Sequence, residues 1–130
     1  MEKQIFDPWE WGKQTNTVQA VEVKNVTGTL YCSGQVAIDA QGIPSAADMR
    51  TQLIHAIKNL EELIDNAGYA CENIVRLNVY TTSTQEFFVS CMDVFGPFIQ
   101  KYGIKQATTL LGVKELFATL TIELEATVVK

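Results

Sequence analysis

Hydrophobic positions recur along the chain with two different periods, and each period predicts its own kind of element. Residues 49–67 carry apolar side chains three and four positions apart, which predicts a helix with one apolar face. Ser45 and Asp48 form a capping-box pattern before it, and Gly68 stands just beyond its expected end. The apolar face of this expected helix consists of Met49, Leu53, Ala56, Ile57, Leu60, Leu63, Ile64 and Ala67.

A second stretch with helical period follows Ser83, which forms a fuller capping box with Glu86. The stretch runs to Tyr102 with aromatic residues on one side. Gly96 and Pro97 interrupt it, because proline removes a backbone hydrogen bond and clashes with the preceding turn. We therefore expect a kink near Gly96 and Pro97, or two short helices.

Alternation with a period of two predicts strands elsewhere. The expected strands span 17–23, 30–36, 74–81, 107–113 and 119–129, and a short further strand lies near the Gln41–Gly42 turn. Residues 24–28 are expected to form a hairpin that joins the first two of these strands. Since a helix lies between 30–36 and 74–81, a right-handed crossover would make the strand 74–81 parallel to an earlier one.

The resulting order, βββαβαββ, predicts an α+β fold with a mixed six-stranded sheet and two helices packed on one face. We expect a single domain over residues 1–130, with 1–13 as an irregular arm. Trp9 and Trp11 in that arm are expected to cover either the chain's own core or a neighbouring subunit. The other sheet face, with Tyr31 and Glu123, is too apolar for ordinary surface and too polar for a core. Association of subunits through these faces, with polar clefts between them, would account for that mixture.

Composition and charge narrow the functional classes. The 130 residues carry a net charge of −5, which disfavours a nucleic-acid partner. No apolar run approaches the roughly 20 residues of a membrane helix, and the N-terminus lacks a secretory pattern, so we expect a cytoplasmic protein without a membrane partner. The three cysteines lack C-x-x-C spacing, which argues against a disulfide framework and a zinc site.

Two short stretches carry candidate chemistry. In Leu30–Val36 a glycine, Gly34, stands on the apolar side of a strand, which indicates a bulge or a close approach by another backbone or a ligand. Glu123 and Glu125 lie two residues apart on one strand face, at roughly 7 Å. If that face lines a half-buried interface, desolvation and the neighbouring charge raise a carboxyl pKa and allow a base near neutral pH. The alternative is a pair of solvated residues on a polar face.

The ordered motifs resemble one known family over roughly residues 17–129. They are Q-A-V at 19–21, L-Y-C-S-G-Q-V at 30–36, N-L at 59–60, A-G at 67–68, V-R-L-N-V-Y at 75–80 and I-E-L-E-A at 122–126. Together they resemble the RidA/YjgF family of reactive-intermediate deaminases. The resemblance implies a chorismate-mutase-like fold and a homotrimer that binds a small metabolite in clefts between subunits. It also implies hydrolysis of enamines and imines to a 2-oxo acid and ammonia, with no metal and no cofactor.

Carried over to this chain, the resemblance assigns Ser33, Gly34 and Gln35 to the lining of the cleft and Glu123 to positioning the attacking water. In the deaminating members an arginine precedes the small hydroxyl residues of the penultimate strand and binds the substrate carboxylate. Here Ala107 occupies that position, before Thr108 and Thr109.

A second ligand contact of the family is also changed, because Thr17 stands where the family has a tyrosine. Lys105 or Lys114 could supply a positive charge in place of the missing arginine. Three interpretations stay open: a hydrolase or deaminase whose substrate lacks the carboxylate or binds it differently, a non-catalytic small-molecule binding protein, and an endoribonuclease or translation inhibitor. The last is the least supported, because the chain is acidic.

Overall fold

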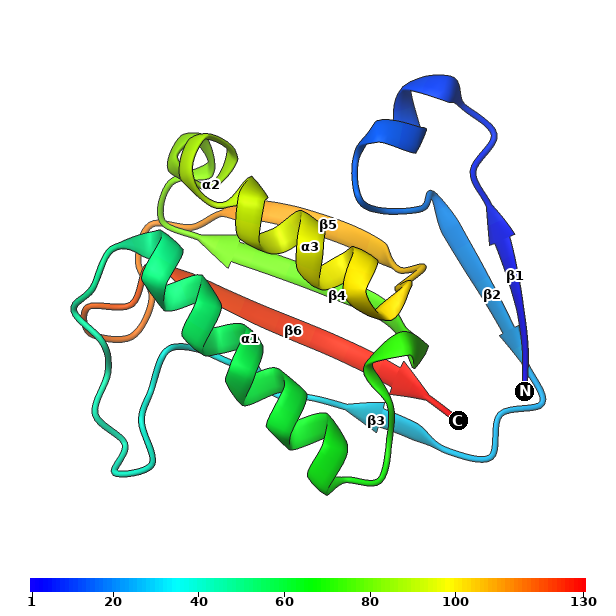
Figure 1. Cartoon of the computed structure of the whole chain (residues 1–130), viewed down its shortest axis with the longest axis horizontal. Coiled ribbons are helices and arrows are strands. Elements are labelled where there is room, and N and C mark those ends of the chain that lie inside the picture. The colour runs from blue at the N-terminus through cyan, green and yellow to red at the C-terminus, as the bar shows by residue number, and fades with distance from the viewer.

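The computed structural model describes all residues, 1–130, and its centre is a four-stranded sheet with helices on one face (Figure 1). The strand order is β3-β6-β4-β5. These strands span Thr29–Tyr31 (β3), Ile122–Val129 (β6), Ile74–Thr81 (β4) and Ala107–Gly112 (β5). The helices span Met49–Asn66 (α1), Thr84–Ser90 (α2) and Met92–Tyr102 (α3). The α+β fold predicted from the sequence is confirmed.

Strand directions follow from the crossovers. Strand β6 runs antiparallel to both β3 and β4, so β3 and β4 point the same way with β6 between them. Helix α1 makes the connection between β3 and β4, whereas α2 and α3 connect β4 to its parallel neighbour β5. The strand 74–81 is therefore parallel in direction to an earlier strand, as expected, although the two are not hydrogen-bonded neighbours.

Helix α1 buries the predicted stripe against the sheet, with Met49, Leu53, Leu60 and Ile64 almost fully shielded from solvent. Its N-cap is Asp48, whose side chain accepts from the Thr51 N–H at 2.7 Å, so the cap lies three residues later than a box beginning at Ser45 would place it. Gly68 follows the helix with a left-handed φ of 77°, as predicted.

The second helical stretch divides in two at Cys91, not at Gly96 and Pro97. Pro97 lies inside α3, and the carbonyl that its missing N–H would bond, that of Asp93, belongs to the first turn of the new helix. The break at Cys91 falls six residues before the proline. Phe87 and Phe95 pack edge to face across it, with ring centroids 5.6 Å apart.

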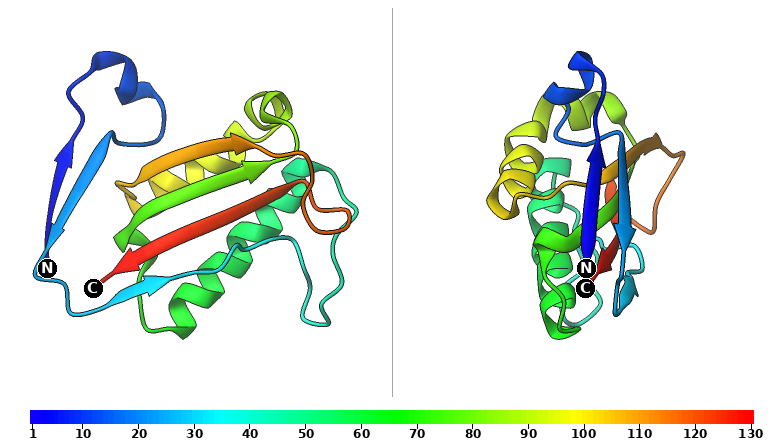
Figure 2. Two further views of the ribbon diagram at one scale, coloured as in Figure 1. Left: turned by 180° about the vertical axis from the view of Figure 1, so that it is seen from behind. Right: turned by 90° about the vertical axis from the view of Figure 1, so that its right-hand side faces the viewer.

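The N-terminal region differs most from the sequence-based expectation. Residues 1–13 are not an irregular arm: Glu2–Phe6 forms strand β1, and Glu10–Gln14 forms a short 3-10 helix. Strand β1 pairs antiparallel with β2, Ala20–Lys24, in a two-stranded ribbon that stands off from the main sheet (Figure 2). The expected hairpin from β2 to β3 is wrong, because β2 takes β1 as its partner and β3 takes β6.

The six strands are therefore split into sheets of four and two, and the single six-stranded sheet of the prediction is wrong. The expected short strand near residue 42 reduces to one bridge between Ile38 and Pro44 around a turn, where Gly42 adopts a φ of 80°. Trp9 and Trp11 stack on each other and stay largely exposed, so they do not cover this chain's core.

The core lies between the helices and one face of the sheet. Alternate residues of β4 and β6 enter it, among them Leu77, Val79, Leu124 and Ala126. The opposite face of the four-stranded sheet carries no helix (Figure 2). None of the helices has the length and apolar character needed to cross a bilayer.

Candidate ligand site on the open sheet face

The open face of the sheet is built by the other alternate residues of the same strands. Cross-strand register sets Tyr80 opposite Glu123, Asn78 opposite Glu125, and Arg76 opposite Thr127. On the other side of β4, register sets Arg76 beside Ala107 and Asn78 beside Thr109. These side chains are half-buried or exposed, while Leu77, Val79, Leu124 and Ala126, which alternate with them in β4 and β6, are buried. This face therefore gathers the polar groups of the sheet.

Gly34 lies against the carboxylate of Glu123. A Cβ atom at Gly34 would stand 2.5 Å from the Glu123 carboxyl carbon, a distance that no real contact tolerates. The backbone of Gln35 exchanges two hydrogen bonds with Leu124, which fixes this approach. The glycine is thus explained by close contact with a side chain, and Ser33, Gly34 and Gln35 lie beside Glu123.

Two amides on α1 hold this arrangement from the helix side. Asn59 donates to the carbonyls of Val36 and Ile38 at 2.8 and 3.0 Å, which anchors the chain just after Gln35. Gln52, fully buried, accepts from the Thr121 N–H and donates to the Thr119 carbonyl, which anchors the start of β6 just before Glu123. Sequence reasoning assigned neither residue a role; the only signal was that Gln52 and Asn59 follow Met49 and Ala56 of the apolar stripe by three residues, at helical spacing.

The electrostatics of this group centre on Glu123. Burial raises the pKa of Glu123, and the neighbouring Glu125 carboxylate raises it further. Glu125 accepts hydrogen bonds from Asn78 and from the Tyr80 hydroxyl, at 3.1 and 2.9 Å, whereas no side chain donates to Glu123. Of the two carboxylates, Glu123 is therefore the one free to accept a proton.

The remaining predicted residues gather at the start of β5. Val18 forms a bridge with Ala107, and the Thr17 hydroxyl donates to the Gln106 carbonyl at 2.8 Å. Gln106 is fully buried, and its amide donates to the Thr108 hydroxyl at 3.1 Å. Thr109 stays exposed on the open face. The structure thus brings Thr17 beside Ala107, and the side-chain amide of Gln106 binds the hydroxyl of Thr108.

The two groups of predicted residues are apart within one chain. On β4, the register position of Glu123 and that of Ala107 are separated by four residues, about 13 Å along the strand. Strands β5 and β6 flank β4 on opposite sides, about 9.6 Å from each other. A separation of roughly 16 Å across one sheet follows, which a small metabolite cannot span.

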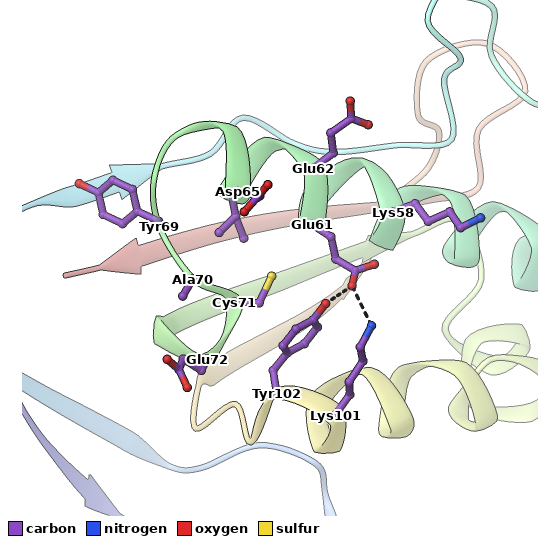
Figure 3. Close-up of a pocket in the computed structure, with 11 residues that line it drawn as sticks. Lys58, Glu61, Glu62, Asp65, Tyr69, Ala70, Cys71, Glu72, Lys101 and Tyr102 are labelled. Atoms are coloured by element: carbon purple, nitrogen blue, oxygen red, sulfur yellow. Dashed lines mark hydrogen bonds and ion pairs between the residues drawn. The ribbon is translucent and has the colours of Figure 1, made fainter.

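A large cavity lies on the other side of the molecule, between the ends of α1 and α3 (Figure 3). Its volume is about 830 Å³, and it contains neither Glu123 nor Ser33. Glu61 there is already engaged by the Tyr102 hydroxyl and by Lys101. Cys71 lines the cavity, and burial raises the pKa of its thiol to about 11, so it is a poor nucleophile. The sequence predicted Tyr102 only as part of an apolar stripe.

A second cavity of about 760 Å³ separates the N-terminal segment from α3 and the start of β5. Thr17 and Lys105 line it, whereas Lys114 lies exposed beyond the end of β5. No three histidine, cysteine or acidic side chains gather in a geometry that could hold a metal ion. The expectation of chemistry without metal or cofactor stays a prediction.

Comparison with known proteins identifies the family to which this chain belongs. Residues 14–130 match the family model described as Endoribonuclease L-PSP. A RutC family protein of Aquifex aeolicus is 31% identical over 112 residues, 86% of each chain. The chain belongs to the RidA/YjgF family.

Solved structures agree with this membership. The Rid family protein YyfB of Yersinia pestis superposes with a TM-score of 0.81 at 28% identity, and the match covers all of both chains. The YjgF gene product of Escherichia coli, 23% identical, shares the fold with a TM-score of 0.69 over 87% of each chain. The similarity to YyfB therefore includes strand β1, which precedes the region matched by the Endoribonuclease L-PSP family model.

Proposed function

We propose that this chain is a homotrimeric hydrolase of a small imine or enamine, in which Glu123 positions and activates the attacking water. The observation that carries the proposal is the state of Glu123: a half-buried carboxylate against Gly34, with a raised pKa and no internal donor. A carboxylate in this condition accepts a proton near neutral pH more readily than a solvated one. Hydrolysis of an imine needs such a base, since water must lose a proton as it attacks carbon.

Association through the open sheet faces would complete the site. Within one chain the group around Glu123 and the group around Ala107 lie roughly 16 Å apart. In the proposed trimer each cleft takes Ser33, Gly34, Gln35 and Glu123 from one subunit. The neighbouring subunit contributes Thr17, Ala107, Thr108 and Thr109. The exposed Tyr31, 80% accessible in the single chain, is an apolar surface that such an interface would cover.

Substitution of Glu123 tests the proposal. Glu123→Gln should abolish ammonia release from a hydrolysable imine or enamine, while the assembled mass in sedimentation stays that of three chains. Glu62→Gln, on the exposed side of α1, is the matched control and should keep the full rate. An unchanged rate in Glu123→Gln would remove this residue from the mechanism, and a monomeric wild type would remove the cleft.

The identity of residue 107 limits which substrates the cleft can bind through a carboxylate. A methyl group provides none of the bidentate, charge-assisted contact of a guanidinium at this position. We therefore expect no acceleration of ammonia release from the enamine that a dehydratase forms from serine. Acceleration with that substrate would contradict the claim that Ala107 disables the standard reaction of the family.

A non-catalytic binding protein is the second candidate, favoured by the changes at Ala107 and Thr17. A ligand that binds in the cleft and is recovered unchanged, with equal affinity for Glu123→Gln, would support it. The family description also raises an endoribonuclease, which the net charge of −5 disfavours. Salt-sensitive retention of RNA by the purified protein would support that third function.

A further inference from the structure

The cavity of about 760 Å³ beside the N-terminal segment lies outside the proposed cleft. Residues between 7 and 18 line one side of it, and residues between 99 and 105, from the end of α3 to the start of β5, line the other. It contains neither Glu123 nor Ala107, and Thr17 is the only residue that it shares with the predicted cleft. Its volume is typical of sites that bind small molecules.

One part of this cavity is apolar and preformed. Val18, Ile99 and Ile104 line it and are buried. The Val18 N–H donates to the Gln106 carbonyl at 3.0 Å, and the Ile104 N–H donates to the Ile99 carbonyl at 3.0 Å. These bonds join the N-terminal segment to the start of β5 and fix the end of α3. The cavity can therefore receive a hydrocarbon group without rearrangement of its apolar wall.

Two opposite charges line the cavity and have no partner within the chain. Asp7, on the N-terminal side, forms none of the four ion pairs, and its Oδ1 atom is buried without a hydrogen-bond partner. Lys13, which also lines the cavity, is engaged instead by Glu10 at 2.8 Å. Lys105, on the other side, is exposed and unpaired.

Packing holds the Asp7 carboxylate in place. Its Oδ1 atom lies against the buried Gly12, where an added Cβ atom would stand 3.2 Å from it. A half-buried carboxylate without a counter-charge is unfavourable, because it has lost part of its hydration and gained no donor. An ammonium group in the cavity would supply both the charge and the hydrogen bond.

Three side-chain amides complete the polar lining. Gln14 and Asn16 lie on the N-terminal side, and Gln100 lies on α3. Asn16 accepts a hydrogen bond only through its backbone carbonyl, so its side chain, like those of Gln14 and Gln100, is not bonded within the chain. A primary amide offers two donors and one acceptor, which is the complement of a peptide bond.

We infer that this cavity is a binding site for a short peptide of dipeptide size, with its ammonium group at Asp7 and its carboxylate at Lys105. The inference goes beyond the proposed function, because it involves neither Glu123 nor hydrolysis. Asp7 and Lys105 lie on opposite sides of the cavity, so the ligand must hold its two charges apart. A free amino acid carries both charges on one carbon atom, whereas two residues of extended chain separate them by roughly 7 Å.

Calorimetry of the full-length protein with L-alanyl-L-leucine tests the ligand class. Wild type should bind this dipeptide, and its N-acetylated and C-terminally amidated forms should bind about 10-fold more weakly, since each cap removes one charge. Free leucine should also bind about 10-fold more weakly. No binding of the dipeptide, or equal affinity for free leucine, would overturn the inference.

Substitutions at the two charges test where the dipeptide lies. Asp7→Asn should weaken binding of the free dipeptide by about 10- to 100-fold and leave the N-acetylated form unchanged. Lys105→Gln should weaken it by only about 3- to 10-fold, because this lysine is exposed, and should leave the amidated form unchanged. Glu115→Gln and Lys114→Gln, both exposed and outside the cavity, are the matched controls.

A loss in Asp7→Asn that is equal for the free and the N-acetylated dipeptide would contradict the ammonium contact. If Asp7→Asn melts well below wild type, the two ligands compared on wild type decide, and equal affinity for them counts against the assignment.

The peptide site and the proposed hydrolase fail separately. Glu123→Gln should bind the dipeptide as tightly as wild type does, because Glu123 does not line this cavity. Loss of imine hydrolysis in Glu123→Gln, with no binding of the dipeptide to wild type, would refute the peptide site alone. Binding that depends on Asp7, with no imine hydrolysis by wild type, would refute the hydrolase and leave the peptide site in place.

Discussion

The two faces of strand β6 differ in how deeply their side chains are buried. Ile122, Leu124 and Ala126 are fully buried against the helices, while Glu123 and Glu125, between them, are half-buried on the open face. These three buried side chains are hydrocarbon, and they belong to the core between the sheet and this chain's own helices. The open face has no helix of this chain packed on it, and its β6 side chains include Glu123, Glu125 and Thr127. One strand thus serves stability with one set of residues and the proposed site with the other.

The largest expected loss of stability comes from a substitution on the core face of β6. Leu124→Ala deletes a fully buried side chain between β4 and α1 and should lower the free energy of unfolding by about 2–5 kcal/mol. Chemical denaturation measures it. Thr127→Ala on the open side of the same strand is the control and should change stability by less than about 0.5 kcal/mol. Equal losses in both variants would show that the two faces are not energetically distinct.

Gly34→Ala tests the contact at the edge of the open face. The new methyl group overlaps the Glu123 carboxyl group, so the flexible Glu123 side chain must move away, and we expect loss of any Glu123-dependent activity with a loss of stability of about 1 kcal/mol or less. Combining Gly34→Ala with Glu123→Ala removes the overlap and should recover most of the stability. Thermal unfolding of wild type, the two single variants and the double variant gives the coupling free energy between positions 34 and 123. Additive losses would mean that the two residues do not touch.

The same division explains how much the sequence could predict. Alternation and helical period depend on burial against the chain's own elements, so they located α1, β4 and the core face of β6. They failed at β1, because Glu2–Phe6 is exposed at every residue and carries no burial pattern. They also failed for the pairing of β2, since hairpin signals report local turns, whereas a strand chooses its partner through contacts distant in sequence.

The candidate site was predicted in part for a related reason. Gly34 was recognisable as a close approach, and Glu123 as a residue of an alternating strand. The approaching group could not be named, because the two residues are 89 positions apart and meet only through the pairing of Gln35 with Leu124. The roles of Asn59 and Gln52 were likewise hidden, since a helix period does not reveal which carbonyls an amide will meet.

Tyrosine titration sharpens the comparison between the open face and the helix side. The hydrogen bond to Glu125 raises the pKa of Tyr80, and the hydrogen bond to Glu61 raises that of Tyr102, so one late-ionising phenol is expected on each side. Ultraviolet absorbance near 295 nm follows phenolate formation with pH. Tyr80→Phe should remove one late component and Tyr102→Phe the other. A titration curve that keeps both late components in Tyr80→Phe would refute the Tyr80–Glu125 contact.

The smallest expected effect is on stability at Glu123. Burial and Glu125 raise the pKa of Glu123 above its usual value of 4.5, so the folded state holds this proton more tightly than the unfolded state does. Wild type should therefore lose stability as pH rises from about 4.5 through the raised pKa, while Glu123→Gln should not.

Below that window both proteins should melt alike, and above it the variant should melt higher by no more than about 4 °C, since solvent screens a half-exposed carboxylate. Glu62→Gln should follow wild type at every pH. If the melting curves of Glu123→Gln and wild type stay parallel from pH 4 to pH 8, the carboxylate is solvated. That result would contradict the assignment of Glu123 as the base on the open face, whereas the conclusions about the core face of β6 would still hold.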